Sequence, residues 1–550
     1  MNDQPHFDLV DQPWIPVLDQ DRVREVSLRE ALVNAQEFRG LDTAEPLEAV
    51  AMLRQALLPV LFDACGLPRS EREWGERWAA GSLDAARIDE YLDRHRDRFD
   101  LFHPVAPFAQ VAGLEASTGE VKPISALALA MASGNNVPLF ASSIANDPPS
   151  LSCPEVTRTL LAAHCFDTAG VKSAAVGDSL GKKGKSWPGL APLGNLGVVI
   201  PTGRNLAQTL LLNTPIVPQG LRVDDLPQWR QPPHSAKWTT RGALGLMDLM
   251  TFQARRIRLM PDVWRAVQAI GTPMDSAPTK VTVSWAVLCA GDRLSPLPEY
   301  EPHTQWKEVD KTDADGPARR PVLLQSGRAA WRGLAPLLAS TPTADGVQTS
   351  LLLAQAHDLQ AMGFIDANVQ LEVQTTGVAY GAKSAVIENV ISDAVPLPVA
   401  ALRADSEVRG LVLEVVDQSE RLRKAANDLD DTLRRASGGA PIPWDKSQRL
   451  GDVLIGRLGG LAHRLLLGLQ RSPDLVDEAE TAWLRAARST AFEVAELGIS
   501  ATPSMAFLGR PGRNAKYPDR ASDAEARFRA TVNKILPRRD SDNDLKGVSS

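Results

Sequence analysis

The run Gly181-Lys-Lys-Gly-Lys-Ser186 contains the residue types that hold phosphate groups in proteins. Its end resembles a Walker A motif, in which a glycine-rich loop and a lysine surround a nucleotide's phosphates. The spacing fails, because the motif needs glycine where Ser179 stands and a helix where Trp187 and Pro188 follow. A true P-loop is therefore not predicted. One function that the segment still allows is that of a metabolic enzyme that holds a phosphorylated ligand through residues 181–197. We keep it as the alternative to the function inferred below.

The same stretch is locally basic. Between Ser179 and Val223 the chain has no Asp or Glu, and several glycines lie among its cations. Glycine lets a backbone lie close to a ligand with its N–H groups bare. Such a segment is either a solvated, mobile loop or a loop that contacts a groove or a phosphate backbone. The cations are Lys182, Lys183, Lys185, Arg204 and Arg222, and the glycines are Gly189, Gly194 and Gly197.

Two other segments could contact a nucleic acid. In residues 377–386 a strand-like run ends in small residues, with Lys383 and Ser384 at the tip. A narrow tip could enter a duplex or its minor groove, although an ordinary β-turn has the same composition. In residues 253–258, strand alternation places Arg256 and Arg258 on one face and Arg255 on the other. These arginines could line RNA or DNA, or pair with acidic neighbours.

Catalytic and metal-binding patterns are not found in the sequence. It contains no HExxH and no GxSxG, and its four cysteines form no CxxC pair, so no structural zinc site is predicted. His164 and Cys165 are neighbours on a predicted helix and face apart, which argues against a Cys–His dyad. We therefore expect a protein that is not an enzyme and that has no metal and no cofactor.

A fold of both helices and strands must position these segments. A chain of 550 residues is too long for one core. We predict an α+β fold, with a large mixed N-terminal domain over residues 1–395 and a C-terminal four-helix bundle over 396–537. Residues 538–550 are predicted to be a disordered tail. The bundle is predicted from four long amphipathic stretches, over residues 398–437, 444–471, 475–498 and 520–536.

Shorter elements are predicted along the N-terminal domain. Residues 7–18 read as the opening of a β-hairpin. Ser27 and Glu30 form a capping box, so a helix should follow to about Phe38. Further helices are predicted over 46–65, 154–166, 205–213, 331–339 and 347–361, and strands over 198–200, 255–260, 280–290 and 371–378.

The overall charge limits how the chain could bind nucleic acid. The formal net charge is -7, so any contact with phosphates must come from local basic patches. The sequence has no run of 18 apolar residues and no basic start followed by an apolar segment. We expect a cytoplasmic protein with no membrane contact.

Several segments, taken in order, resemble one family, the large subunit of the type I-E CRISPR surveillance complex Cascade, or CasA family. The series begins with residues 7–18 and continues through 107–110, 135–140 and 203–213. It goes on with 225–229, 251–256, 331–334 and 380–384. The sequence departs from the family pattern at Phe252, where Trp is expected, and in lacking CxxC pairs.

The resemblance implies a DNA-reading subunit of a larger machine. It implies that the chain recognises the protospacer-adjacent motif (PAM) in double-stranded target DNA, largely from the minor groove, and that a wedge splits the first base pairs. Guide RNA then reads the rest of the target. The implied partners are the other Cascade subunits with their guide RNA, a small helical subunit that contacts the bundle, and a helicase-nuclease recruited in trans.

The resemblance also suggests roles for single residues. Lys383 and Ser384, with Ala385, match the wedge, where the family usually has Gln or Asn, which leaves the preferred PAM open. Gly189, Gly194 and Asn195 match the glycine loop, next to the basic Lys182, Lys183 and Lys185. Lys280 matches the PAM-contacting lysine, and Asn136, Leu139 and Phe140 match the loop that meets the end of the guide RNA.

Overall fold

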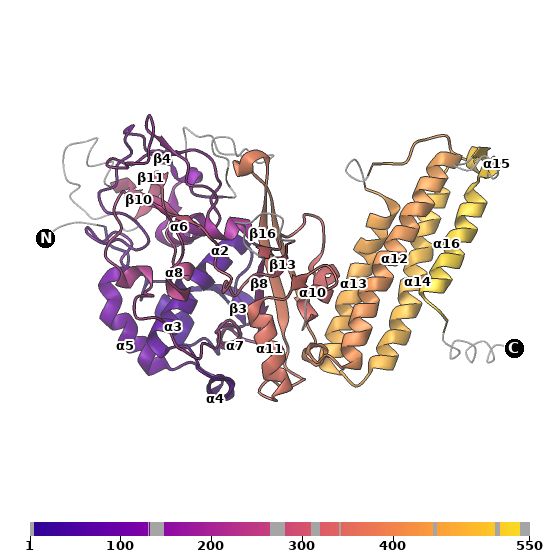
Figure 1. Ribbon diagram of the computed structural model, residues 1–550, viewed down its shortest axis with the longest axis horizontal. Helices are drawn as coiled ribbons and strands as arrows, with labels where there is room; N and C mark the ends of the chain where they lie inside the picture. Colours follow the sequence, from indigo (N-terminus) through magenta and orange to yellow (C-terminus); the bar gives the residue numbers. More distant parts are fainter. Residues whose placement is uncertain are drawn as a thin grey trace. The chain divides into compact units, whose positions relative to one another are not determined.

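The computed structural model describes residues 5–129, 131, 148–263, 281–309, 319–339, 343–443, 448–511 and 518–538. The chain divides into two compact units (Figure 1). The first comprises residues 1–328, 340–365 and 372–394, and the second comprises residues 329–339, 366–371 and 395–550. Mixed helices and strands build the first unit and long helices the second, which confirms the predicted fold class. The domain boundary at 395 and the disordered tail stay predictions, and residues 539–550 lie outside the described part.

The first unit opens with the predicted hairpin. β1 (Ile15–Asp19) pairs antiparallel with β2 (Arg22–Val26) and with β3 (Gly40–Leu41). Ser27 then caps α1 (Leu28–Val33), its hydroxyl accepting from the N–H of Glu30 at 3.1 Å. The helix ends before Phe38, contrary to the prediction. Carbonyls of residues 35 and 38 instead accept from the first N–H groups of a later helix, α7 (Leu206–Leu212).

A continuous helical rod forms much of the interior of this unit. It consists of α2 (Pro46–Met52), the π-turn η1 (Leu53–Leu57) and α3 (Leu58–Cys65), and it ends at Gly66 with φ +71°, as predicted. α6 (Cys153–Phe166) packs against α2 and follows its predicted range closely. The remaining helices and turns of the unit are α4 (Glu71–Ala80), α5 (Ala85–His95), η2 (Arg96–Phe99), η3 (Ile124–Ala126), η4 (Pro192–Asn195), η5 (Gln228–Arg230), α8 (Leu246–Met250) and α11 (Leu351–Ala361).

Two sheets of the first unit carry the segments of interest. In the larger one, β10 (Arg255–Pro261) pairs with β11 (Thr282–Ala290), which pairs with β6 (Lys172–Ser173), and β6 pairs with β7 (Lys185–Ser186). In the smaller one, β16 (Glu372–Tyr380) lies between β17 (Ile387–Pro396) and β8 (Val198–Thr202). The other strands are β4 (Lys122–Pro123), β5 (Leu151–Ser152), β9 (Thr240–Arg241), β12 (Arg293–Leu294), β13 (Trp306–Glu308), β14 (Arg319–Pro321) and β15 (Val347–Gln348).

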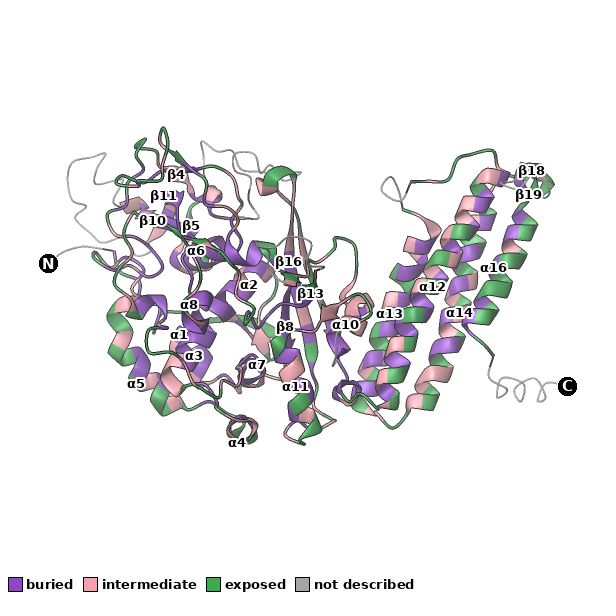
Figure 2. Cartoon of the chain, in the orientation of Figure 1, coloured by how far each residue is buried: buried purple, intermediate pink, exposed green. Residues whose placement is uncertain are grey.

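The second unit contains the predicted four-helix bundle. Its helices are α12 (Glu407–Ala436), α13 (Leu450–Arg471), α14 (Val476–Ser500) and α16 (Ala521–Ile535). Each buries an apolar stripe and exposes its charged face (Figure 2). The first helix starts later than predicted, because a separate turn, η8 (Val399–Leu402), precedes it. The unit also includes η6 (Ala330–Gly333), α10 (Leu334–Leu338), α15 (Met505–Leu508), β18 (Arg510–Pro511) and β19 (Pro518–Asp519).

Candidate nucleic-acid interface

Three segments far apart in the sequence meet in the first unit. They are residues 167–172 after α6, residues 189–195 before β8, and the tip between β16 and β17. The N–H of Ala169 donates to the carbonyl of Ser384 at 2.8 Å, and the N–H of Ala191 donates to that of Asp167 at 3.0 Å. The hydroxyl of Tyr380 donates to the carbonyl of Phe166 at 2.5 Å. We call this meeting point the loop junction.

The hairpin tip has an unusual backbone. Lys383 and Ser384 adopt φ values of 56° and 52°, in the left-handed region that non-glycine residues rarely occupy. The turn is η7 (Ala382–Ser384), closed by the N–H of Gly381, which donates to Val386 at 2.9 Å. Lys383 is exposed, whereas Ser384 and Ala385 are half-buried. Strained backbone of this kind persists only where its surroundings hold it, and the hydrogen bond to Ala169 is one such restraint.

Buried charges lie beneath the loop junction. Arg255 is fully buried, and its Nε donates to the carboxylate of Asp167 at 2.5 Å. One Nη of Arg255 also donates to the carbonyls of Thr168 at 2.9 Å and Gly189 at 2.8 Å, so a single guanidinium ties two loops together. Burial alone would raise the pKa of Asp167, but the charges of Lys172 and Arg255 lower it, which keeps the carboxyl ionised.

The predicted glycine loop is less open than expected. Gly189 has φ +80°, and its carbonyl is held by Arg255. Gly194 is buried, and a Cβ there would lie 2.8 Å from the hydroxyl oxygen of Tyr380. Gly194 therefore lets the tyrosine pack closely and presents no bare backbone to a ligand in this conformation. Asn195 is exposed.

Sequence reasoning missed the short segment of residues 168–170. It follows the buried end of α6 directly, and its Ala169 is the residue that binds the hairpin tip. The signal was available, because small residues ending in Gly170 follow a helix whose last turn is wholly buried. The resemblance drew attention instead to the glycines twenty residues further on.

The basic segment forms a two-residue β-hairpin. Lys182 and Lys185 exchange two backbone hydrogen bonds of 2.8 and 3.0 Å, around Lys183 and Gly184 with φ values of 51° and 74°. All three lysines are exposed. Positive φ at both central residues is the geometry of a type I′ turn, which matches the twist of its strands. This basic hairpin is joined through β7 to β6, and so to the loop junction.

The same geometry argues against a phosphate-holding loop. A Walker A motif places its serine at the start of a helix, whereas Ser186 lies in β7. Its hydroxyl is buried and donates to the carboxylate of Asp178 at 2.7 Å. The indole N–H of Trp238 also donates to that carboxylate, at 3.1 Å.

The arginines of β10 face inward. Arg256 pairs with Asp292 at 3.0 Å and is buried, as Arg255 is. Of the two roles that the sequence left open, pairing with acidic neighbours is therefore the one found for these two residues. Further along the strand, Arg258 lies 3.5 Å from the carbonyl of Leu114 and is half-buried.

Four predicted site residues lie outside the described residues. They are Lys280, matched to the PAM-contacting lysine, and the guide-end residues Asn136, Leu139 and Phe140. Their roles therefore rest on the sequence.

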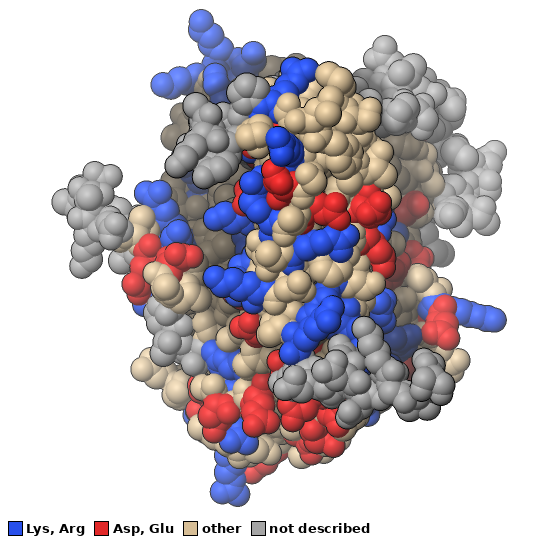
Figure 3. Space-filling view, turned by 90° about the vertical axis from the view of Figure 1, so that its right-hand side faces the viewer, with Lys and Arg blue, Asp and Glu red and all other residues tan. Residues whose placement is uncertain are grey.

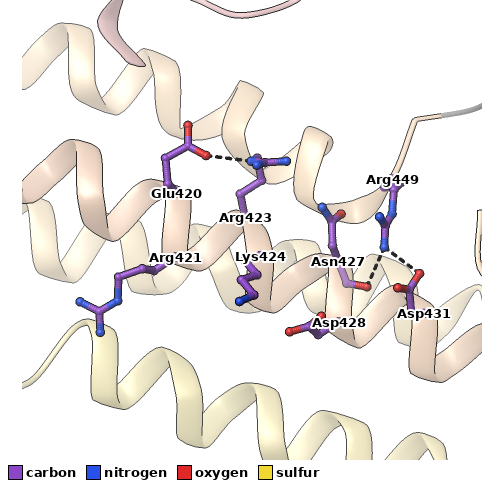
Figure 4. Close-up of a pocket in the computed structure, with 8 residues that line it drawn as sticks. All are labelled: Glu420, Arg421, Arg423, Lys424, Asn427, Asp428, Asp431 and Arg449. Carbon is purple, nitrogen blue, oxygen red and sulfur yellow. Dashed lines mark hydrogen bonds and ion pairs between the residues drawn. The ribbon is translucent and has the colours of Figure 1, made fainter. Parts of the chain in front are cut away.

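The bundle presents a face of mixed charge. Figure 3 looks onto it and shows an upright band of Lys and Arg side chains, with Asp and Glu both beside the band and below it. A shallow cavity of about 440 Å³ lies on α12 and the start of α13 (Figure 4). Arg449 pairs there with Asp431 at 2.7 Å, and Arg423 with Glu420 at 2.9 Å. The cavity is lined by Glu420, Arg421, Arg423, Lys424, Asn427, Asp428, Asp431 and Arg449.

The described residues offer neither a metal site nor a membrane-spanning helix. Among the described residues, no group of three or more His, Cys, Asp or Glu side chains could hold a metal ion. The described helices include none with the length and hydropathy to cross a membrane.

Comparison with known proteins finds one family over most of the chain. Residues 8–494 match the family described as CRISPR-associated protein Cse1. A protein of Thermus thermophilus named CRISPR-associated protein CasA/Cse1 is 37% identical over 265 residues, covering 46% of this chain and 49% of that protein. The match thus spans about half the length of that relative.

Solved structures share the fold. The crystal structure of Thermobifida fusca Cse1 matches with a TM-score of 0.82 and 30% identity, over 98% of this chain and 99% of that one. A chain of a structure titled CRISPR RNA-guided surveillance complex matches with a TM-score of 0.66 and 20% identity, over 96% and 99% of the two chains. At that identity the second likeness concerns the fold alone.

Proposed function

The chain belongs to the CRISPR-associated Cse1 (CasA) family of large subunits of the CRISPR surveillance complex, and on that premise we propose that it recognises the PAM in double-stranded DNA and opens the first base pairs. The observation that carries this proposal is the hairpin tip, a narrow turn with an exposed lysine that the loop junction holds in a strained conformation. A tip of this shape suits entry into a duplex.

The physical chemistry of the proposed contacts suits a subunit that recognises a short DNA motif and accepts variation in its sequence. Minor-groove contacts mainly separate A·T from G·C, so a subunit that reads from this groove accepts several PAMs. Unstacking a base step costs a few kcal/mol, which a rigid wedge and phosphate contacts offset. In the proposal, Lys383, Ser384 and Ala385 form the wedge. Lys182, Lys183 and Lys185 contact phosphates.

The loop junction supplies the rigidity that a wedge needs. Gly189, Gly194 and Asn195 support the tip from below. Lys280 contacts the PAM, and Asn136, Leu139 and Phe140 meet the end of the guide RNA, as the family resemblance implies. No nuclease motif is visible in the sequence, so cleavage is assigned to a helicase-nuclease recruited in trans.

The bundle is assigned to protein contacts. Its outward face carries both signs of charge, many of them already paired on the same helix, such as Arg421 with Asp417 at 3.2 Å. A paired surface binds phosphates weakly but suits a partner with complementary charges. We assign this face to the small helical subunit of the complex.

The deciding experiment is a DNA mobility shift with the other guide-RNA-bearing subunits, with and without this chain, on a randomised PAM library. We expect the chain to enrich particular PAMs. The double variant Lys383→Ala, Ser384→Ala should assemble normally and lose that enrichment. The control is Lys307→Ala, an exposed lysine of β13, which should behave as wild type.

Other results would favour a different function for the chain or for its hairpin tip. Unchanged PAM enrichment in the double variant would remove the wedge assignment. Assembly without any effect of the chain on DNA affinity would indicate a scaffold, and phosphate binding by the isolated chain would favour the metabolic enzyme.

A further inference from the structure

A large aromatic side chain is exposed beside the loop junction. Trp187 exposes 55% of its surface, although tryptophan is usually mostly buried. In the β6–β7 ladder, Lys172 lies opposite Ser186 and Ser173 opposite Lys185. Extending this register by one residue past the ladder places Val171, which is 47% exposed, opposite Trp187. Two apolar side chains that flank the ladder are thus exposed to solvent.

The same face carries positive charge. Alternate residues of a strand share a face, so Lys185 lies on the face of Trp187, whereas Lys172 and Ser186 point to the buried side. Among the described residues, Lys182, Lys183 and Lys185 form no ion pair. Two carboxylates that contact this ladder accept hydrogen bonds from its serines: Asp178 accepts from Ser186, and Glu120 accepts from Ser173 at 2.7 Å. We call Val171, Lys185 and Trp187 the aromatic platform.

The platform is joined to the hairpin tip by short connections. Val171 is two residues from Ala169, which binds the carbonyl of Ser384. Trp187 is two residues from Gly189, whose carbonyl is held by Arg255. The platform therefore lies directly along the chain from both loops of the junction, and both loops are fixed by hydrogen bonds.

We propose that the aromatic platform stacks on an unpaired base of the DNA that the hairpin tip opens, with Trp187 as the stacking residue and the lysines holding the adjoining phosphates. This inference rests on the proposed function. An exposed aromatic ring among lysines is the arrangement by which proteins hold single-stranded nucleic acid without sequence preference. The exposed indole ring favours a nucleic acid over an acidic protein surface, because charge alone would suit either and only a base stacks on the ring.

The test uses the assembled complex with its guide RNA. The target duplex contains 2-aminopurine next to the PAM in the strand that does not pair with the guide. A second duplex has mismatches there, so that it is already open. The variants are Trp187→Ala, Trp187→Phe and the matched control Tyr300→Ala, an aromatic residue that is 42% exposed.

We expect Trp187→Ala to weaken binding about tenfold on both duplexes, because the variant loses the stacking of a base on the aromatic ring. It should also reduce the quenching of 2-aminopurine. Trp187→Phe should retain most of both signals, and Tyr300→Ala should retain both fully.

Equal affinity and equal quenching in wild type and Trp187→Ala would overturn the platform. Loss of assembly in Trp187→Ala, with DNA binding by the assembled fraction unchanged, would also overturn it in favour of a protein contact. The proposed function fails separately, if wild type shows no PAM preference. Trp187-dependent quenching without PAM preference would support the platform and refute PAM reading.

Discussion

The two units of this chain differ in the polar groups that their interiors contain. The first unit buries whole ion pairs: Arg54 lies 2.5 Å from Glu301, and the two side chains expose 2% and 0% of their surfaces. Asp167 with Arg255 and Asp292 with Arg256 are buried as well. In the bundle, every buried polar side chain that the structure describes is neutral: Gln418, Ser419, Thr432 and Gln470.

The difference follows from what each unit must hold in place. Long helices satisfy their own backbone hydrogen bonds, so apolar packing is enough to assemble them. The first unit consists largely of short strands and loops, whose backbone groups need other partners. A buried arginine with several donors supplies them, as Arg255 does for Thr168 and Gly189. Positioned loops thus depend on charge pairs, and the bundle does not.

The strongest test of this contrast is to break the deepest ion pair. Arg54→Met leaves the carboxylate of Glu301 buried, next to His303, without its main partner. Such a loss is expected to destabilise the first unit by about 3–5 kcal/mol. The measurement is urea unfolding, with hydrogen exchange to locate the loss. The double variant Arg54→Met, Glu301→Gln should recover part of it.

The matched control is a bundle arginine. Arg421 pairs with Asp417 at 3.2 Å, and both are about half exposed. Arg421→Met is expected to change stability by less than about 0.5 kcal/mol, because solvent screens exposed pairs. Similar losses in the two variants would contradict the contrast between the units.

Acidification should lower the stability of the first unit more than that of the bundle. Burial lowers the pKa of His164 to about 3 and that of His303 to about 4, so both are neutral in the folded first unit. The unfolded chain binds these protons below about pH 6.5. Their contribution to stability is therefore complete above pH 6.5 and is lost as the pH falls towards 4. At pH 5 the loss is about 2 kcal/mol for each histidine.

The check is hydrogen exchange at pH 7 and pH 5, corrected for intrinsic exchange rates. Peptides from α6 should lose protection at pH 5, and peptides from α14 should keep theirs. His463→Gln, which changes an exposed histidine of the bundle, should leave the pH dependence unaltered. Equal loss in both units would mean that acid acts on the chain as a whole.

The smallest expected effects concern packing within the bundle. A Cβ at Gly451 would lie 2.4 Å from the carbonyl oxygen of Arg423, so α12 and α13 approach there backbone to backbone. Gly451→Ala is expected to destabilise the bundle by about 1–3 kcal/mol through overpacking.

Gly456, in the same helix, supplies the opposite case. It is exposed, and a Cβ there meets nothing within 4 Å. Gly456→Ala should stabilise the bundle by about 0.5–1 kcal/mol, because alanine favours the helix. Thermal unfolding measures both variants. A stabilising Gly451→Ala would show that the helices separate easily, and that close packing is not what holds the bundle.

Sequence reasoning located many of the longer elements, because their signals are local, although it missed α4, α5 and β17. Ser27 and Asn205 cap the helices that follow them, and the amphipathic period marked all four bundle helices. It failed where another segment intervened, as at residues 34–38, where the carbonyls of Ala35 and Phe38 accept hydrogen bonds from α7. It could not choose a role for Arg255 and Arg256, because Asp167 is 88 positions from Arg255 in the chain.

By itself, the sequence determined the helical bundle, the basic stretch and the family resemblance, since each depends on residues close together or in a fixed order. Only the tertiary structure decided that residues 167–172, 189–195 and the hairpin tip meet at one place. It also decided that Trp187 stays exposed while Arg54 is buried against a glutamate 247 residues away. The physical reason is that a helix is specified by the spacing of apolar residues that lie close together in the sequence. The pairing of a buried charge depends instead on which distant segments fold against it.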